Sequence, residues 1–217
     1  MENDVKEFLS ELLKQLKSID YIKPEDIPNI DLYMDQVTTF MDEQLAASKR
    51  YESDKILTKT MINNYAKNNL LPSPDKKKYS KEHVLTLLFI YYFKNILSIN
   101  DIRSILNPLT EKYFGNDDGF TMQDVYTEVF SLEAEESQKL LKDLGKKYKI
   151  AGETFEDFPD EDQKFLHTFS FICMLSFDVY IKKMVIERMI DNLNEGKEAC
   201  SHENTHSGKE SKKTGSN

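Results

Sequence analysis

The chain contains very few residues that interrupt a helix. Its 217 residues include only 7 glycines and 6 prolines. Antiparallel β-folds need frequent turns and usually build them with these two residues. Their scarcity therefore argues against an all-β fold. It also leaves no glycine-rich phosphate-binding loop, because neither G-x-G-x-x-G nor a P-loop motif occurs in the sequence.

Apolar side chains recur at helical spacing along most of the chain, which predicts an all-α fold. We expect helices at about residues 2–18, 32–47, 58–69, 80–96, 98–107 and 160–193, and further helices between Thr121 and about Tyr148. Polar residues at the starts of these segments are typical N-caps, and the candidates are Asp31, Thr58 or Thr60, Ser80, Ser98 and Thr121. Pro108 is expected to end the helix that Ser98 begins.

The most apolar stretch is FLHTFSFICMLSFDVYI, residues 165–181. It contains His167 and Asp178 and is shorter than the ~20 residues that a membrane-spanning helix needs. We expect a buried core helix in which His167 has a hydrogen-bond partner and Cys173 is a small buried residue. Apolar residues continue to about Leu193 around most of the helix, which leaves two interpretations open: a central helix of the chain's own bundle, or a homodimer seam.

Charge is distributed unevenly along the chain. The whole protein has a formal net charge of −9, whereas residues 49–94 hold ten lysine and arginine side chains against four carboxylates, a net charge of +6. Clustered positive charge attracts phosphate backbones through counterion release. A solvated basic surface without any partner is the plain alternative.

The order of the predicted elements gives this basic segment a structural context. The elements follow the order of a winged helix-turn-helix: a helix (32–47), a loop, a short polar helix (58–69), a turn with prolines and lysines, and then an apolar helix. In such units the short helix enters the major groove and the basic loop lies along the phosphates. The predicted DNA-binding residues are Thr58, Lys59, Thr60, Asn63, Asn64 and Lys67 on the helix, and Lys76, Lys77, Lys78 and Tyr79 on the wing.

Several of these residues also have simple structural interpretations. Thr58 or Thr60 could serve only as an N-cap, and Tyr65 and Tyr79 are suited to pack in a small core. Asn64 could bind a neighbouring loop backbone instead of a base.

The run MINNYAKNNLLP, residues 61–72, resembles the recognition-helix signature of MerR-type transcriptional regulators, roughly T-[LI]-R-Y-Y-E-x-x-G-L-[LI]-x-P. KKKYS at 76–80 resembles the end of their basic wing. Residues 99–102, INDI, stand at the place of their G-[FL]-S-L-x-E-I motif. LYMDQVTTFMDEQL, LTKTMINNY and KKKYSKEH together are more similar to a bacterial family of uncharacterised MerR-like proteins, catalogued mainly as a domain of unknown function. The resemblance implies a DNA-binding fold and dimerisation through a C-terminal helix.

Three departures from the MerR pattern affect the interpretation. Asn63 stands where that family has a phosphate-binding arginine, Asn64 where it has a tyrosine, and Asn69 where it has a glycine, a position for which we expect a left-handed conformation. We divide the chain into an N-terminal helix and linker (1–30), a MerR-like winged helix-turn-helix (31–108), a C-terminal helical region for dimerisation or effector binding (109–194) and a disordered tail (195–217).

No catalytic or cofactor-binding constellation stands out, so we predict no enzyme, no cofactor and no metal site. Cys200, His202 and His206 have the right atoms for a metal but lie in the polar tail. Two distant cysteines do not form a disulfide framework, which favours the cytoplasm. The predicted function is sequence-specific binding of double-stranded DNA by a homodimeric transcriptional regulator. The alternatives are a protein-interaction adaptor on the same scaffold and a small-molecule-sensing helical domain.

Overall fold

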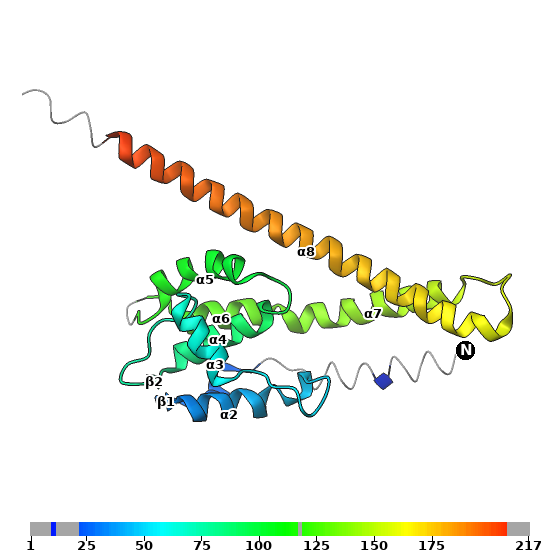
Figure 1. Ribbon diagram of the computed structural model, residues 1–217, viewed down its shortest axis with the longest axis horizontal. Coiled ribbons are helices and arrows are strands. Elements are labelled where there is room, and N and C mark those ends of the chain that lie inside the picture. The colour runs from blue at the N-terminus through cyan, green and yellow to red at the C-terminus, as the bar shows by residue number, and fades with distance from the viewer. Residues whose placement is uncertain (1–9, 12–21, 117–118, 208–217) are drawn as a thin grey trace, which may run out of the picture.

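The computed structural model describes residues 10–11, 22–116 and 119–207, and there the chain is mostly helical, which confirms the all-α class (Figure 1). The helices are η1 (Pro24–Asp26), α2 (Met34–Gln44), η2 (Ala46–Ser48), α3 (Lys59–Lys67), α4 (Lys81–Phe93), α5 (Ile99–Tyr113), α6 (Met122–Ser131), α7 (Glu133–Gly152) and α8 (Asp160–Ser207). Two short strands, β1 (Leu32–Tyr33) and β2 (Lys78–Tyr79), complete the described elements. The helix expected at 2–18 falls almost wholly outside the described residues.

The core is built around α4. Its residues from His83 to Ile90 are all buried, and a helix that is buried on every side must be surrounded by other elements. α5, α6 and β2 all contact it. The ring of Phe89 lies 5.5 Å from that of Tyr126 and 5.7 Å from that of Phe130, measured between centroids. The Tyr126 hydroxyl also donates a hydrogen bond to the carbonyl of Ile22, at 2.8 Å, which fixes the chain that leads into the domain.

The two strands hold the starts of α2 and α4 side by side. Leu32 pairs with Tyr79, and Tyr33 pairs with Lys78, in antiparallel register. This pairing explains why α2 begins later than expected, since residues 32 and 33 are extended. Asp31 is therefore not the N-cap. Tyr33 occupies that position, and its N–H donates to Oε1 of Gln36 at 2.8 Å.

The other expected caps are confirmed. Thr58, Ser80, Ser98 and Thr121 are the N-cap residues of α3, α4, α5 and α6. Pro108, however, does not end α5, which continues to Tyr113. The proline is exposed, so its ring faces water, while Leu106 on the opposite side of the helix is completely buried. The predicted boundary of the winged helix-turn-helix region, after residue 108, therefore falls inside α5.

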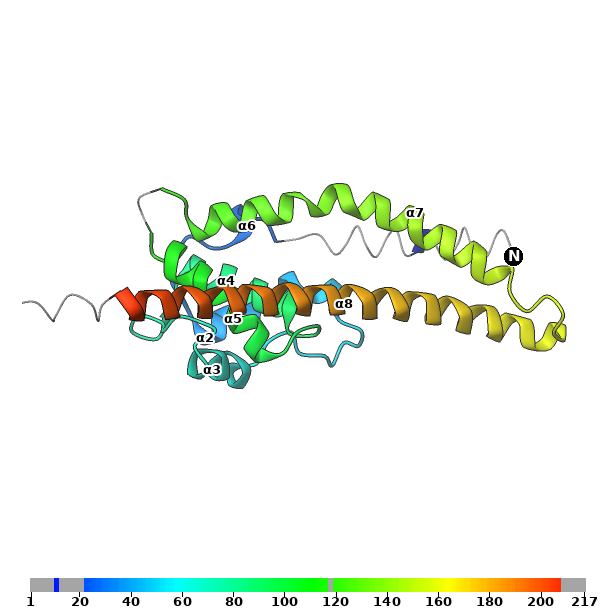
Figure 2. The same ribbon diagram turned by 90° about the horizontal axis from the view of Figure 1, so that it is seen from above.

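α7 and α8 form a long helical hairpin beside this core. Figure 2 shows the two helices antiparallel near their connection, with α8 then crossing over α5. Lys147 of α7 joins them, because its ammonium group pairs with Asp143 at 2.5 Å and also with Asp178 of α8. α8 also contacts α5, and Ile190 of α8 is buried as part of the core.

The apolar stretch 165–181 is not a buried core helix, contrary to the expectation. α7 covers one side of it, where Phe171 is buried, but Phe165, Phe169 and Phe177 are 70%, 51% and 65% exposed. Cys173 is exposed as well. His167 does have a partner, since its Nε2 lies 2.8 Å from the carbonyl of Thr154. The central-helix interpretation therefore does not hold for this stretch within a single chain.

α8 continues past residue 194, where the sequence analysis expected a disordered tail, and ends at Ser207. Residues 195–207 contain no proline and one glycine, Gly196, so nothing in this segment forces the helix to stop. Residues 208–217 lie outside the described part of the chain. None of the described helices combines the length and the apolarity that crossing a membrane requires.

Candidate nucleic-acid interface

α3 has one buried side and one fully exposed side. Ile62 and Tyr65 pack into the core. Thr60, Asn63, Asn64 and Lys67 are exposed and follow the i, i+3, i+4, i+7 spacing of a single helical stripe, opposite to the buried pair. Four of the six predicted helix residues thus share one outward face.

The other two predicted helix residues have structural partners. The hydroxyl of Thr58 accepts a hydrogen bond from the N–H of Met61 at 3.2 Å, which is the N-cap role that the sequence analysis kept as an alternative. Lys59 lies to the side of the outward stripe, and its ammonium group forms an ion pair with Asp35 of α2. Because both partners are largely exposed, this pair contributes little to stability.

The outward residues of α3 are poor choices for helix stability. Asn and Thr rank well below Ala, Lys or Glu in intrinsic helix propensity, by up to ~0.7 kcal/mol per residue. Within the described chain, no hydrogen bond engages the side chains of Asn63, Asn64 or Thr60. Asn64 contributes its backbone carbonyl to Asn68, at 2.8 Å, but its amide is not used to satisfy a loop. These three side chains therefore have no evident role in holding the fold together.

The end of α3 is set by Asn69. Its φ of 55° lies in the left-handed region, as expected for the residue that stands in the place of a glycine. The N–H of Leu70 then reaches back to the carbonyl of Tyr65 at 2.9 Å, which closes the helix. Leu70 and Leu71 are buried, so the chain turns sharply into the core before it reaches the basic loop.

The basic loop ends in a two-residue turn at Lys76 and Lys77. The N–H of Lys78 donates to the carbonyl of Asp75 at 2.8 Å, and the two intervening lysines have φ values of 46° and 66°. Positive φ at both central residues defines a type I′ turn, which strongly favours Asn-Gly. For residues with a long side chain this conformation costs about 1–3 kcal/mol at each position. The turn therefore keeps two exposed lysines at a local cost in stability.

Lys78 and Tyr79 differ from the two turn lysines. The ammonium group of Lys78 lies 5.6 Å from the ring centroid of Tyr33, on the paired strand. Tyr79 is buried, which raises the pKa of its hydroxyl, and the ring belongs to the core. Tyr79 is therefore removed from the set of residues available for contact with DNA, in agreement with the core alternative given for it. Tyr65 is buried in the same way.

The end of α4 holds the long loop between α2 and α3 in place. Lys94 donates a hydrogen bond from Nζ to the carbonyl of Ile56 at 2.6 Å and lies 5.0 Å from the ring centroid of Tyr91. Burial lowers the pKa of this lysine. The hydroxyl groups of Ser48 and Tyr91 form a further hydrogen bond. These contacts fix the loop immediately before α3 and so determine where that helix starts. The sequence analysis missed this role of Lys94, which only its position after a fully apolar helix could have suggested.

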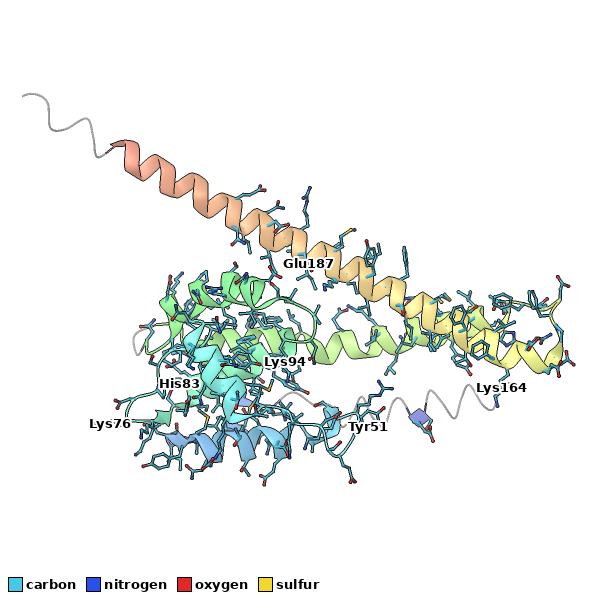
Figure 3. The ribbon with its side chains drawn as sticks, in the orientation of Figure 1. Tyr51, Lys76, His83, Lys94, Lys164 and Glu187 are labelled. Atoms are coloured by element: carbon cyan, nitrogen blue, oxygen red, sulfur yellow. The ribbon has the colours of Figure 1, made fainter. Side chains whose placement is uncertain are left out.

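Figure 3 places Lys76 at the outer edge of the molecule and His83 further inward. The N–H of Ser80 donates to Nδ1 of His83 at 3.0 Å, and the imidazole ring packs edge-on between Tyr79 and Phe114. Burial lowers the pKa of the imidazole; the carbonyls of Ser73 and Pro72 and the carboxylate of Asp31 oppose this effect. Among the described residues, Nε2 has no hydrogen-bond partner of good geometry. The side chain is therefore a neutral, buried part of the support beneath the turn.

The positive charge of the segment is partly balanced inside the chain. Lys49 pairs with Asp42 at 2.7 Å, Lys59 pairs with Asp35, and Lys94 points inward. An open groove of about 390 Å³ between α2 and the start of α3 is lined by charges of both signs. Among the described residues, the exposed Lys67 at the far end of α3 and Lys76 and Lys77 on the turn form no ion pair, and neither do Arg50, Lys55 and Lys81 of the same segment.

Other kinds of site find little support in the described residues. They contain no group of three or more His, Cys, Asp or Glu side chains placed to hold a metal ion. The side chains of Cys200, His202 and His206 lie outside the described part. A small-molecule sensor would be marked by an apolar pocket between α7 and α8. Two open grooves are found elsewhere in the described residues, one at α2 and the start of α3 and the other on α5, where it is lined by polar residues such as Asn100 and Arg103.

Comparison with known families gives one match. Residues 22–129 match the family described as Domain of unknown function (DUF1836). The matched region begins at the buried Ile22 and ends near the close of α6, so it covers the core, α3 and the basic turn. Neither the comparison with curated proteins nor that with solved structures found a match.

Proposed function

We propose that the protein is a sequence-specific DNA-binding transcriptional regulator. The main supporting observation is that the outward side of α3 and the turn at residues 76–77 keep side chains that weaken the fold. Asn63, Asn64 and Thr60 are poor helix formers without internal partners, and Lys76 and Lys77 occupy strained backbone positions. Such local conflicts between stability and sequence are typical of functional surfaces.

The arrangement of elements supports a winged helix-turn-helix mode of binding. α2 and α3 contact each other, and the β1–β2 pair with the turn at residues 76–77 follows as a small wing. In this mode the outward stripe of α3 enters the major groove, while Lys67, Lys76 and Lys77 lie against phosphates. The resemblance to MerR-type regulators in residues 61–80 is a second, sequence-based support.

We further propose that the regulator is a homodimer joined through α8. Large apolar side chains remain exposed along this helix from Phe165 to Leu193. Contiguous apolar surface of this extent marks an interaction site. A second copy is the occupant that fits DNA binding, because a two-fold dimer places two recognition helices on successive major grooves.

The test is a fluorescence-anisotropy titration with random double-stranded DNA at several salt concentrations. We expect salt-dependent binding, and the variant Lys76→Ala/Lys77→Ala should reduce the slope of log K against log salt by up to about 2, because each lost phosphate contact lowers it by roughly 1. Lys146→Ala/Lys164→Ala is the matched control, since it removes two exposed lysines of the α7–α8 hairpin. An equal slope in both variants would show that the turn does not contact phosphates.

A protein-interaction adaptor is the second candidate. The pairs Lys59–Asp35 and Lys49–Asp42 and the mixed-charge groove beside α3 favour it, because they use part of the basic segment inside the chain. Well-folded protein that binds no duplex at low salt would support this adaptor and reject the regulator.

A further inference from the structure

We infer that the outward stripe of α3 reads A·T base pairs in the major groove. This inference rests on the proposed function and adds to it the class of base pair that the protein recognises. It assigns Asn63 and Asn64 to adenine and Thr60 to the neighbouring thymine. The observation behind it is the composition of the stripe together with the exposure of its side chains.

The stripe has the right extent to contact base edges. Thr60, Asn63 and Asn64 lie in the first two turns of α3, and residues near the N-terminus of a recognition helix are those that reach bases. A rise of about 1.5 Å per residue separates Thr60 from Asn64 by roughly 6 Å along the axis. Successive base pairs are about 3.4 Å apart, so the stripe spans about two base pairs.

The chemistry of these side chains selects adenine over guanine. An Asn amide offers one acceptor and one donor group, which match N6–H and N7 of adenine as a bidentate pair. Guanine presents two acceptors, O6 and N7, and is normally read by Arg or Lys. α3 contains no Arg, and Lys59 turns aside to Asp35.

Thymine and cytosine are distinguished by the remaining residue. The methyl group of Thr60 can contact the C5-methyl of thymine, which cytosine lacks. Cytosine is read by a carboxylate that accepts from N4, and α3 contains neither Asp nor Glu. Lys67, one helical turn beyond Asn63 and Asn64, is placed for a phosphate rather than a base.

The amides are also available for this role. Asn68 donates from its own amide to the carbonyl of Asn64, whereas the amides of Asn63 and Asn64 have no hydrogen-bond partner among the described residues. They can therefore bind adenine without first breaking an internal contact, so that only water must be displaced.

The first experiment selects bound sequences from a library of random duplexes of about 20 bp, long enough for two half-sites. We expect the selected half-sites to contain at least two adjacent A·T pairs. Fluorescence anisotropy then compares the selected duplex with one in which these pairs are replaced by G·C. The replacement should weaken binding about 5- to 150-fold per bidentate pair.

The second experiment tests the assigned atoms. Replacing adenine by 7-deaza-adenine removes the N7 acceptor and keeps base pairing, and should weaken binding by wild-type protein about 5-fold or more. The same replacement should have little further effect on the variant Asn63→Ala/Asn64→Ala. This variant is expected to fold, because Ala is a better helix former than Asn. Uracil in place of thymine, paired with Thr60→Ser, tests the methyl contact in the same way.

The outcomes distinguish the A·T preference from DNA binding itself. Salt-dependent binding with equal affinity for A·T and G·C duplexes would overturn the A·T inference and leave a DNA-binding protein. A preference for A·T that survives 7-deaza-adenine in wild-type protein would also overturn it, because recognition would then come from the minor groove or from DNA shape. A folded protein without affinity for any duplex would reject both proposals.

Discussion

His83 shows how a single buried side chain supports the surface proposed to bind DNA. Its ring lies between Tyr79, at the end of the turn-bearing strand, and Phe114, after α5. Its Nδ1 accepts a hydrogen bond from the N–H of Ser80, the N-cap residue of α4. The neutral form is what this site accommodates, because burial disfavours an imidazolium there and lowers the pKa of the imidazole.

The lowered pKa of His83 predicts a pH-dependent stability. Above the ordinary value of 6.5 the imidazole is neutral in both the folded and the unfolded state, and its contribution to stability is fully present. As the pH falls below 6.5, the unfolded chain binds the proton first, so the free energy of unfolding decreases by up to about 1.4 kcal/mol per pH unit until the folded-state pKa is passed.

Urea unfolding between pH 7.5 and 5.5 measures this effect. His83→Gln keeps an acceptor for the Ser80 N–H but cannot be protonated, so we expect a flatter pH profile than in wild-type protein. His167→Gln, which leaves His83 in place, is the control for loss of a histidine elsewhere in the chain. Parallel profiles for wild-type protein and His83→Gln would contradict the assignment.

At the scale of elements, a change in the turn at Lys76 and Lys77 is expected to raise the stability of the fold and to weaken DNA binding. Asn-Gly is the preferred pair for a type I′ turn. Lys76→Asn/Lys77→Gly should therefore raise the free energy of unfolding by about 1–2 kcal/mol, while it weakens salt-dependent DNA binding. Urea unfolding and anisotropy on the same variant measure the two effects.

Lys76→Arg/Lys77→Arg is the matched control for this prediction. It keeps both charges and the positive φ values, so we expect wild-type stability and DNA affinity. If the Asn-Gly variant were no more stable than wild-type protein, the turn would not be strained, and one support for the proposed function would be lost.

At the scale of the whole molecule, most large apolar side chains of α8 between Phe165 and Leu193 remain exposed. α8 contacts both α7 and α5, and Phe171 and Ile190 are buried. Phe177 and Tyr180, which lie between these two residues in the sequence, are 65% and 63% exposed. A second chain that covers them would form a seam parallel to the hairpin.

The proposed homodimer predicts that changes at two exposed aromatic residues of α8 abolish dimerisation. We expect wild-type protein to sediment as a dimer and Phe177→Glu/Tyr180→Glu to sediment as a folded monomer, with the dimer dissociation constant raised about 100-fold or more. Lys164→Glu introduces an exposed carboxylate elsewhere on α8 and should leave the dimer intact. A wild-type monomer at concentrations of about 100 μM would reject the α8 seam.

The sequence by itself determined the features that depend on local hydrogen bonding and spacing. The all-α class, the N-caps Thr58, Ser80, Ser98 and Thr121, and the left-handed Asn69 all follow from residues within one turn of each other. The outward placement of Asn63 and Asn64 follows from the same helical period.

Only the tertiary structure decided which surfaces are covered. Tyr79 looks like a wing residue in sequence but is buried, because its strand pairs with Leu32, far away along the chain. Residues 165–181 look like a core helix but are largely exposed, since apolar periodicity shows that a helix needs partners without showing whether they belong to its own chain. Burial depends on contacts between distant segments, and a local pattern does not contain that information.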